Sequence, residues 1–154
     1  MGASQQTQAK TRMTGAELII RMLEQHGITS VSGIPGGAAL PLYDALGNSR
    51  IRHILARHEQ GAGFIAQGIA RTTGKAAVCI SSSGPGATNL MTAIADAKLD
   101  SVPLVCITAQ VSSPMIGTDA FQEVDTYGMS IPITKHNYLV RNVLDLPGII
   151  ADAF

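Results

Sequence analysis

Short apolar runs alternate with amphipathic stretches along this chain, and the alternation predicts its elements. The apolar runs are rich in branched residues and end at glycine, proline or polar residues, as strands do. They fill residues 28–34, 51–56, 76–82 and 102–108. The last two runs are continuous, which is typical of parallel strands buried on both faces. Residues 133–140 alternate apolar and polar side chains, which predicts a fifth and more exposed strand.

Helical spacing and capping residues separate the apolar runs. Thr14 and Glu17 have the spacing of a capping box, and Gly27 supplies a helix end. The apolar stripe of this first helix is predicted to consist of Leu18, Ile19, Met22 and Leu23. Further helices are predicted to start near Ala39, to cover residues 61–71 directly after Glu59, to end at Lys98 and to open at Asp145.

Strand and helix alternate throughout, so the predicted fold is α/β: a three-layer open sandwich with a mainly parallel sheet and helices on both faces. No repeat or linker divides the chain, and 154 residues suit one domain with its own core. We expect this domain to cover residues 13–154, to be incomplete at its C-terminal end and to follow a polar and disordered leader at 1–12. The loop at 111–124 is longer than ordinary connections, so it is functional or disordered.

Composition narrows the choice of partners. Apolar residues make up 45% of the chain and charged residues 14%, so we expect either a large interface or that the chain is a piece of something larger. The 11 basic and 11 acidic residues balance, which argues against nucleic acid as a partner. No apolar run reaches the roughly 20 residues of a membrane span, and no secretory signal opens the chain.

Cysteine and histidine usage points to a reducing compartment and to no metal site built by this chain. Cys79 and Cys106 each lie in an apolar run without a CxxC pattern, so buried thiols are expected rather than a disulfide. The four histidines do not have the spacing of metal ligands.

The ends of the first three predicted strands carry the candidate chemistry. The Pro35-Gly36-Gly37 turn follows the first strand, Glu59 follows the second, and residues 83–89 follow the third. In a parallel sheet these ends share one edge, where open α/β folds place their ligands. The residues alone leave two interpretations of Glu59 open: a first-turn acid that complements the helix dipole, or a functional carboxylate.

A dinucleotide-binding turn is the main rival interpretation of the glycine-rich loops. The GxGxxG fingerprint would need glycine where residues 33–38 have Pro35 and Ala38. Proline removes a backbone N–H and puts a ring where the pyrophosphate must approach. The loop at 83–89 also lacks the lysine and hydroxyl residue of a P-loop, so neither nucleotide motif is present.

Three motifs in fixed order resemble a known family. They are RHEQGAGFIAQGIAR at 57–71, SSGPGATNLMTAIADA at 82–97 and GTDAFQEVD at 117–125. Together they resemble the N-terminal pyrimidine-binding domain of thiamine-diphosphate enzymes, whose fold this chain would share. Three further segments resemble the large catalytic subunit of acetolactate (acetohydroxyacid) synthases: GIPGGA at 33–38, IGTDAFQE at 116–123 and ITKHNYLV at 133–140.

The resemblance implies a role for each residue of these motifs. Glu59 would be the catalytic glutamate, which hydrogen-bonds N1′ of the aminopyrimidine of thiamine diphosphate. The cofactor would be lined by Pro35, Gly36, Gly37, Glu59, Pro85, Gly86 and Asn89. The substrate and inhibitor channel would be lined by Ala38, Phe121, Gln122 and Lys135. Without the family, Phe121 would be taken as a core aromatic and Lys135 as a solvated lysine.

The implied activity is that of an acetolactate synthase, a transferase. Such an enzyme decarboxylates pyruvate and transfers the two-carbon unit to pyruvate or 2-ketobutyrate, on the routes to valine, leucine and isoleucine. Mg²⁺ and FAD would bind outside this chain, because it has no GDG or NN motif and no central FAD-binding domain. We therefore expect an N-terminal fragment, inactive alone, of a bacterial cytoplasmic enzyme.

The expected partners are other protein subunits. A second copy of the catalytic subunit would complete each active site in a dimer or tetramer, and a regulatory small subunit is a further candidate. Two alternatives stay open. The chain is the same domain of a related thiamine-diphosphate 2-keto-acid decarboxylase or acetyltransferase, or it is a non-catalytic module that pairs with a full-length subunit. Glu59 argues against glyoxylate carboligase, a relative that lacks this acid.

Overall fold

A computed structural model describes residues 12–154, so the predicted leader at 1–12 lies, except for its last residue, outside the described residues. Four strands form one sheet in the order β2-β1-β3-β4, and every neighbouring pair is parallel. The strands are β1 (Ser30–Gly33), β2 (Arg52–Leu55), β3 (Ala77–Ser81) and β4 (Leu104–Thr108). The predicted α/β class with a parallel sheet is confirmed.

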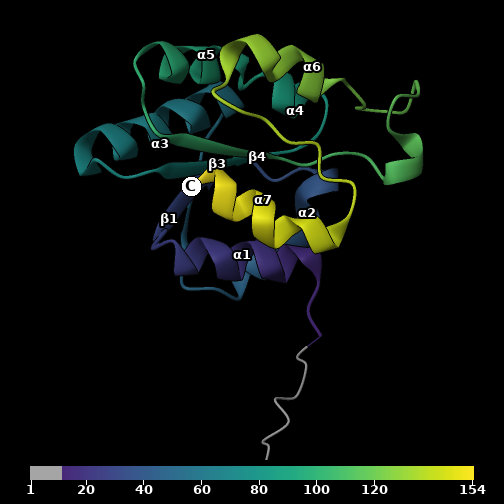
Figure 1. Cartoon of the computed structure of the whole chain (residues 1–154), viewed down its shortest axis with the longest axis horizontal. Helices are drawn as coiled ribbons and strands as arrows, with labels where there is room; N and C mark the ends of the chain where they lie inside the picture. Colours follow the sequence, from purple (N-terminus) through teal and green to yellow (C-terminus); the bar gives the residue numbers. More distant parts are fainter. Residues whose placement is uncertain (1–11) are drawn as a thin grey trace, which may run out of the picture.

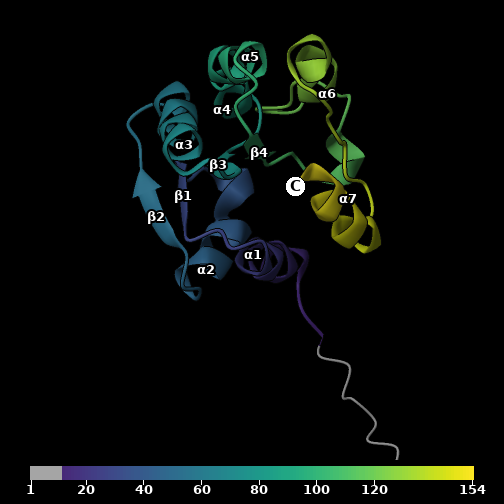
Figure 2. The ribbon, with the colours of Figure 1, turned by 60° about the vertical axis from the view of Figure 1, so that its left-hand side comes forward.

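Helices cover both faces of the sheet, which gives three layers (Figures 1 and 2). One face carries α1 (Gly15–Gln25), α2 (Leu40–Gly47) and α7 (Leu146–Ala153). The other carries α3 (Glu59–Thr73), α4 (Pro85–Thr88) and α5 (Met91–Leu99), with α6 (Thr126–Ser130) beside α5. The 3-10 turns are η1 (Gly37–Ala39), η2 (Ser113–Met115), η3 (Ile131–Ile133) and η4 (Val143–Asp145). Within the described part of the chain, no helix has the length and apolarity that crossing a membrane requires.

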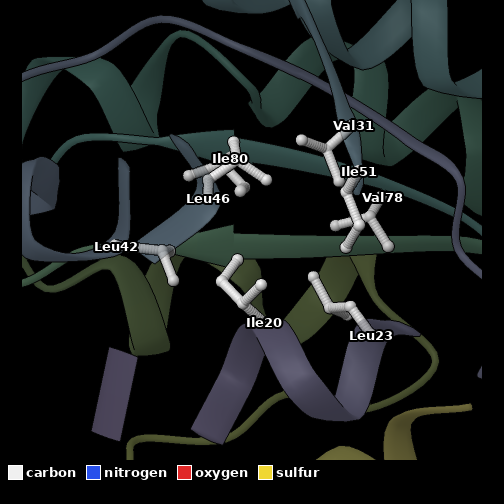
Figure 3. Packing of buried hydrophobic residues seen from close by; sticks show 8 residues of the cluster. All are labelled: Ile20, Leu23, Val31, Leu42, Leu46, Ile51, Val78 and Ile80. Carbon is white, nitrogen blue, oxygen red and sulfur yellow. The ribbon is translucent and has the colours of Figure 1, made fainter. Parts of the chain in front are cut away.

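The first core layer lies between the sheet and α1 and α2 (Figure 3). It consists of Ile20, Leu23, Val31, Leu42, Leu46, Ile51, Val78 and Ile80. Each such side chain contributes about 1.5–3 kcal/mol by leaving water. The stripe predicted for α1 is partly wrong, because the buried positions are Ile20 and Leu23 while Leu18, Ile19 and Met22 are half-buried.

The second core layer lies between the sheet and α3 and α5, and small residues allow the two helices to approach closely. A β-carbon on Gly63 would lie only 2.5 Å from Cβ of Ala93, so this contact needs glycine. The buried amide of Gln67 donates a hydrogen bond of 2.7 Å to the Ala93 carbonyl. Arg71 extends the link through a 2.6 Å contact with Asp100. These contacts fix α3, and therefore its first residue, Glu59, relative to α5.

Two predictions for the last third of the chain are wrong. The continuous apolar run at 102–108 predicts a strand buried on both faces, but β4 is half-buried along its whole length because it forms an edge of the sheet. Residues 133–140 form no strand. Side chains hold this segment instead: Asn137 Nδ2 donates to the Tyr127 carbonyl at 2.7 Å and to Ser130 Oγ at 2.8 Å. Such side-chain bonds compete with ladder formation.

Candidate functional site

After β1 and β3 the chain continues toward opposite faces of the sheet, and the edge between these two strands is therefore a candidate binding site. The chain passes from β1 to α2 on one face of the sheet and from β3 to α4 and α5 on the other. Ligands bind at such switch points in open α/β sheets. The two loops touch here, because a β-carbon on Gly36 would lie 2.5 Å from Cβ and Oγ of Ser82.

Ser82 carries an unsatisfied polar atom at this edge. Its side chain is buried, and Oγ has no hydrogen-bond partner within the described residues. Leaving such a group without a partner costs about 1–3 kcal/mol, so the position suits a ligand atom or a water molecule. Sequence reasoning missed Ser82. The signal was available, since residues 81–83 are three serines at the end of a buried strand.

The Glu59 carboxylate faces the loop that follows β3. Glu59 is the first residue of α3 and is half-buried, and the side chain of His58 caps the helix by accepting from the Gln60 N–H. Asn89 Nδ2 donates a hydrogen bond of 2.9 Å to Glu59 Oε2. The other oxygen, Oε1, lies 3.5 Å from the position of a β-carbon on Gly86. The carboxylate therefore lies between α3 and the turn at α4.

The long loop at 111–124 is anchored on the same edge through Gly84. Gly84 has φ +54°, and a β-carbon on it would overlap the Gln122 backbone. Gln122 itself has φ +60°, a conformation that costs a residue with a side chain about 1–3 kcal/mol. Gln110 Nε2 also reaches the Val124 carbonyl at 3.4 Å. The loop therefore brings Gln122 to the edge, while the Phe121 side chain is 86% exposed.

Tyr43 reaches the sheet from α2, close to the end of β3. Its hydroxyl donates a hydrogen bond of 3.5 Å to the Ile80 carbonyl, and its ring packs edge-on against His53. Burial raises the pKa of the Tyr43 phenol, and the nearby Cys79 and Glu59 groups add to the increase. Tyr43 is thus a neutral hydrogen-bond donor. The sequence around Tyr43 gave no sign of this contact.

The remaining predicted site residues lie at different distances from Glu59. Gly36, Gly86 and Asn89 meet at the edge with Glu59, as the contacts above describe. Exposed positions of the same loops are occupied by Pro35, Gly37, Ala38 and Pro85. Lys135 is exposed and follows Thr134, whose carbonyl accepts a hydrogen bond from Lys98 near the far end of α5. Lys135 is therefore not brought to the edge within this chain.

Comparison with known proteins gives one family. Residues 13–129 match the family described as thiamine pyrophosphate enzyme, N-terminal TPP binding domain. The chain is 70% identical to the acetolactate synthase isozyme 1 large subunit of Escherichia coli, over all of the chain and 28% of that protein. It is 58% identical to the acetolactate synthase large subunit of Corynebacterium glutamicum, over 95% of the chain and 24% of that protein.

A third relative is similar in identity and in the share of its length that the chain covers. The acetolactate synthase isozyme 2 large subunit of Escherichia coli is 56% identical over 92% of the chain and 26% of its own length. The chain thus spans about a quarter of the length of these relatives, in each case 24–28%. Because the family match covers most of the chain, the chain belongs to the N-terminal TPP-binding domains of the thiamine pyrophosphate enzymes.

Proposed function

We propose that this chain, over residues 13–154, is the aminopyrimidine-binding domain of an acetolactate synthase that uses thiamine diphosphate. The observation that carries the proposal is the Glu59 carboxylate, which Asn89 holds beside the two loops of the switch point. The names of relatives that are 56–70% identical to the chain support the choice of this activity.

The residues at the edge fit a flat ring with hydrogen-bonding atoms. The absent side chain of Gly86 leaves a gap between Glu59 Oε1 and Ser82 Cβ, which lie 3.5 and 3.3 Å from where a β-carbon would be. The unpartnered Ser82 Oγ is available to a polar ligand atom. We infer that the ring lies between the turn at Pro35, Gly36 and Gly37 and the turn at Pro85, Gly86 and Asn89.

The residues of this chain would hold and orient the ring. Thiamine diphosphate, when bound, supplies the carbanion chemistry needed to remove carbon dioxide from a 2-keto acid. Glu59 would hold a proton at N1′ of the ring, and Asn89 would fix the direction in which the carboxyl group points. The Gln67 and Arg71 contacts with α5 would keep that pair in register.

The proposal also covers the substrates, the further cofactors and the partner subunits of the intact enzyme. Pyruvate would be the first substrate, and pyruvate or 2-ketobutyrate the second, in a channel that includes Ala38, Phe121 and Gln122. Lys135, which lies away from the Glu59 edge of its own chain, would line this channel in the assembled enzyme. Mg²⁺ and FAD would bind to other domains. A second catalytic subunit, with a regulatory small subunit as a further candidate, would complete the assembly in the bacterial cytoplasm.

A chimera tests the proposal directly. This chain replaces the matching 28% of the Escherichia coli isozyme 1 subunit. We expect the chimera to form acetolactate from pyruvate, and acetohydroxybutyrate when 2-ketobutyrate is added. Glu59→Gln should lower turnover by roughly 10²- to 10⁴-fold, the usual effect of losing a positioned proton-transfer group.

The matched control is Glu24→Gln. Glu24 is also half-buried, but it accepts a hydrogen bond of 3.1 Å from the Arg50 N–H on the opposite side of the sheet, so turnover should not change. Activity of the Glu59→Gln chimera close to that of its parent would contradict the assignment of Glu59. A folded parent chimera that binds the coenzyme without consuming pyruvate would favour the non-catalytic module.

A further inference from the structure

Cys79 and Cys106 face each other across β3 and β4. The two residues are register partners in the parallel pair, and both side chains belong to the core layer between the sheet and α3 and α5. Their Sγ atoms lie 3.3 Å apart, and both thiols are free. Neighbouring strands are about 4.8 Å apart, which lies within the Cα separation of about 4.4–6.8 Å that a disulfide spans.

We propose that Cys79 and Cys106 form a redox modification site, which closes reversibly to an intrachain disulfide when a small-molecule disulfide oxidises it. The inference rests on the strand register and the thiol contact, and it does not depend on the proposed function. The cross-link would join β3 and β4 two residues before Ser81 and Thr108, where the strands end. It would therefore tie together the two strands whose following loops meet at the candidate site.

The disulfide would form in two thiol–disulfide exchange steps, and the burial of each cysteine determines which one reacts first. Cys79 is completely buried, whereas Cys106 is half-buried on the edge strand. Cys106 therefore attacks the small disulfide first, which forms a mixed disulfide and releases one small thiol. The Cys79 sulfur then attacks the Cys106 sulfur, and the second small thiol leaves. Both cysteine protons end on the two released thiols, so the cysteines are oxidised by two electrons and the small disulfide is reduced by two.

The same contact makes the reaction slow near neutral pH. The interaction with the Cys79 thiol, and then burial, raise the pKa of the Cys106 thiol. Because the thiolate is the nucleophile, the rate should rise with pH as more Cys106 ionises. The closed form should resist unfolding better than the reduced form, since the bond constrains the unfolded chain between residues that are 27 positions apart.

The experiment treats the native chain with oxidised glutathione and follows its intact mass. The parent should lose two hydrogen atoms, retain no glutathione, stay monomeric on a non-reducing gel and regain its mass with dithiothreitol. Cys79→Ser should keep one glutathione on Cys106, because it lacks the resolving thiol. Cys106→Ser should stay unmodified, because Cys79 is buried. The oxidised parent should also have a higher thermal midpoint than the reduced one.

Several outcomes would overturn the proposal. They are a parent that keeps one or two glutathiones, a cross-link between two chains, a lower thermal midpoint after oxidation, or a parent that stays unmodified at alkaline pH although the urea-unfolded chain reacts. If a serine substitution prevents folding, Cys79→Ala and Cys106→Ala repeat the comparison with apolar side chains. The mass of the oxidised parent tests the proposal without any variant, because only an intrachain disulfide removes two hydrogen atoms and retains no glutathione.

Discussion

A single hydrogen bond between two side chains orients the carboxylate on which the candidate site depends. Asn89 caps α4, with its backbone N–H bonded to the Pro85 carbonyl, so its position is set by the turn after β3. Glu59 is set independently, by the cap and the packing of α3. The 2.9 Å bond thus joins two separately fixed elements.

Asn89→Leu should therefore weaken coenzyme binding while the fold survives. A hydrogen bond to a charged group contributes about 1.5–3 kcal/mol, which corresponds to about a 10- to 150-fold loss of affinity for thiamine diphosphate. Titration calorimetry on the chimera measures this loss of affinity. Asn48→Leu, at the end of α2, removes a bond only to the Asp44 carbonyl and is the control. Equal affinities for the two variants would show that Asn89 does not orient Glu59 for binding.

The left-handed backbone at Gly84 gives a second prediction at this scale. Gly84→Ala should lower the free energy of unfolding by about 1–3 kcal/mol, because the new methyl group meets the Gln122 backbone and φ is positive. Urea unfolding of the chain measures the change. Gly148→Ala is the control, because Gly148 lies at an exposed position of α7 with open space around it, and the variant should gain about 0.5–1 kcal/mol. A parent-like Gly84→Ala variant would mean that the loop at 111–124 is not held there.

Among the elements, α1 is the one whose start the sequence predicts best. Both bonds of the capping box form: the Glu17 N–H donates to Thr14 Oγ1 at 3.2 Å, and the Thr14 N–H donates to Glu17 Oε2. Thr14→Ala should lower the free energy of unfolding by about 1 kcal/mol, as the loss of an N-cap does. Thr14→Ser keeps the hydroxyl and should stay close to the parent in the same urea titration. A similar loss in both variants would indicate that the hydroxyl is not the cause.

The same cap gives a pH dependence. The backbone and then the side chain of Thr14 donate to Glu17, and these bonds lower the pKa of its carboxyl below 4.5. Because the pKa is lower in the folded chain than in the unfolded chain, the ionised carboxyl stabilises the fold at pH values above its ordinary pKa. This contribution disappears as the pH falls through the lowered pKa of the folded chain. Glu17→Gln should therefore be less stable than the parent at neutral pH, and the difference should shrink at acid pH. A difference that is constant with pH would contradict this origin.

Prediction from the sequence succeeds where the local pattern of apolar and polar residues is enough to determine an element. The continuous apolar run at 76–82 predicts a buried strand, and every residue of β3 is buried. The predictions fail where contacts with another part of the chain determine the structure of a segment. The alternation at 133–140 fits a strand, but hydrogen bonds from Asn137 and Thr134 tie this segment to α6. Likewise, the roles of Ser82 and Tyr43 depend on loops and strands that are distant in sequence, which one local pattern cannot reveal.

At the scale of the whole molecule, the outer face of α3 is a candidate surface for a second subunit. Gly61, Phe64 and Gly68 follow helical spacing, so they share one face. Phe64 is 40% exposed, and β-carbons on Gly61 and Gly68 would meet open space. In Figure 2 α3 lies at one end of its layer, and α6 lies at the other end. An exposed apolar side chain between glycines allows another backbone to approach closely.

We therefore expect the chain to self-associate through this face at high concentration. Phe64→Asp should shift the chain toward monomer in sedimentation velocity, because burying an unpaired carboxylate in an interface is costly. Leu144→Asp is the control, because Leu144 is 80% exposed but lies in η4, which contacts α7 and, through Val143, the start of α1 on the opposite side of the sheet. That variant should associate as the parent does. A parent that remains monomeric at high concentration, or equal loss of association in both variants, would place any subunit contact elsewhere.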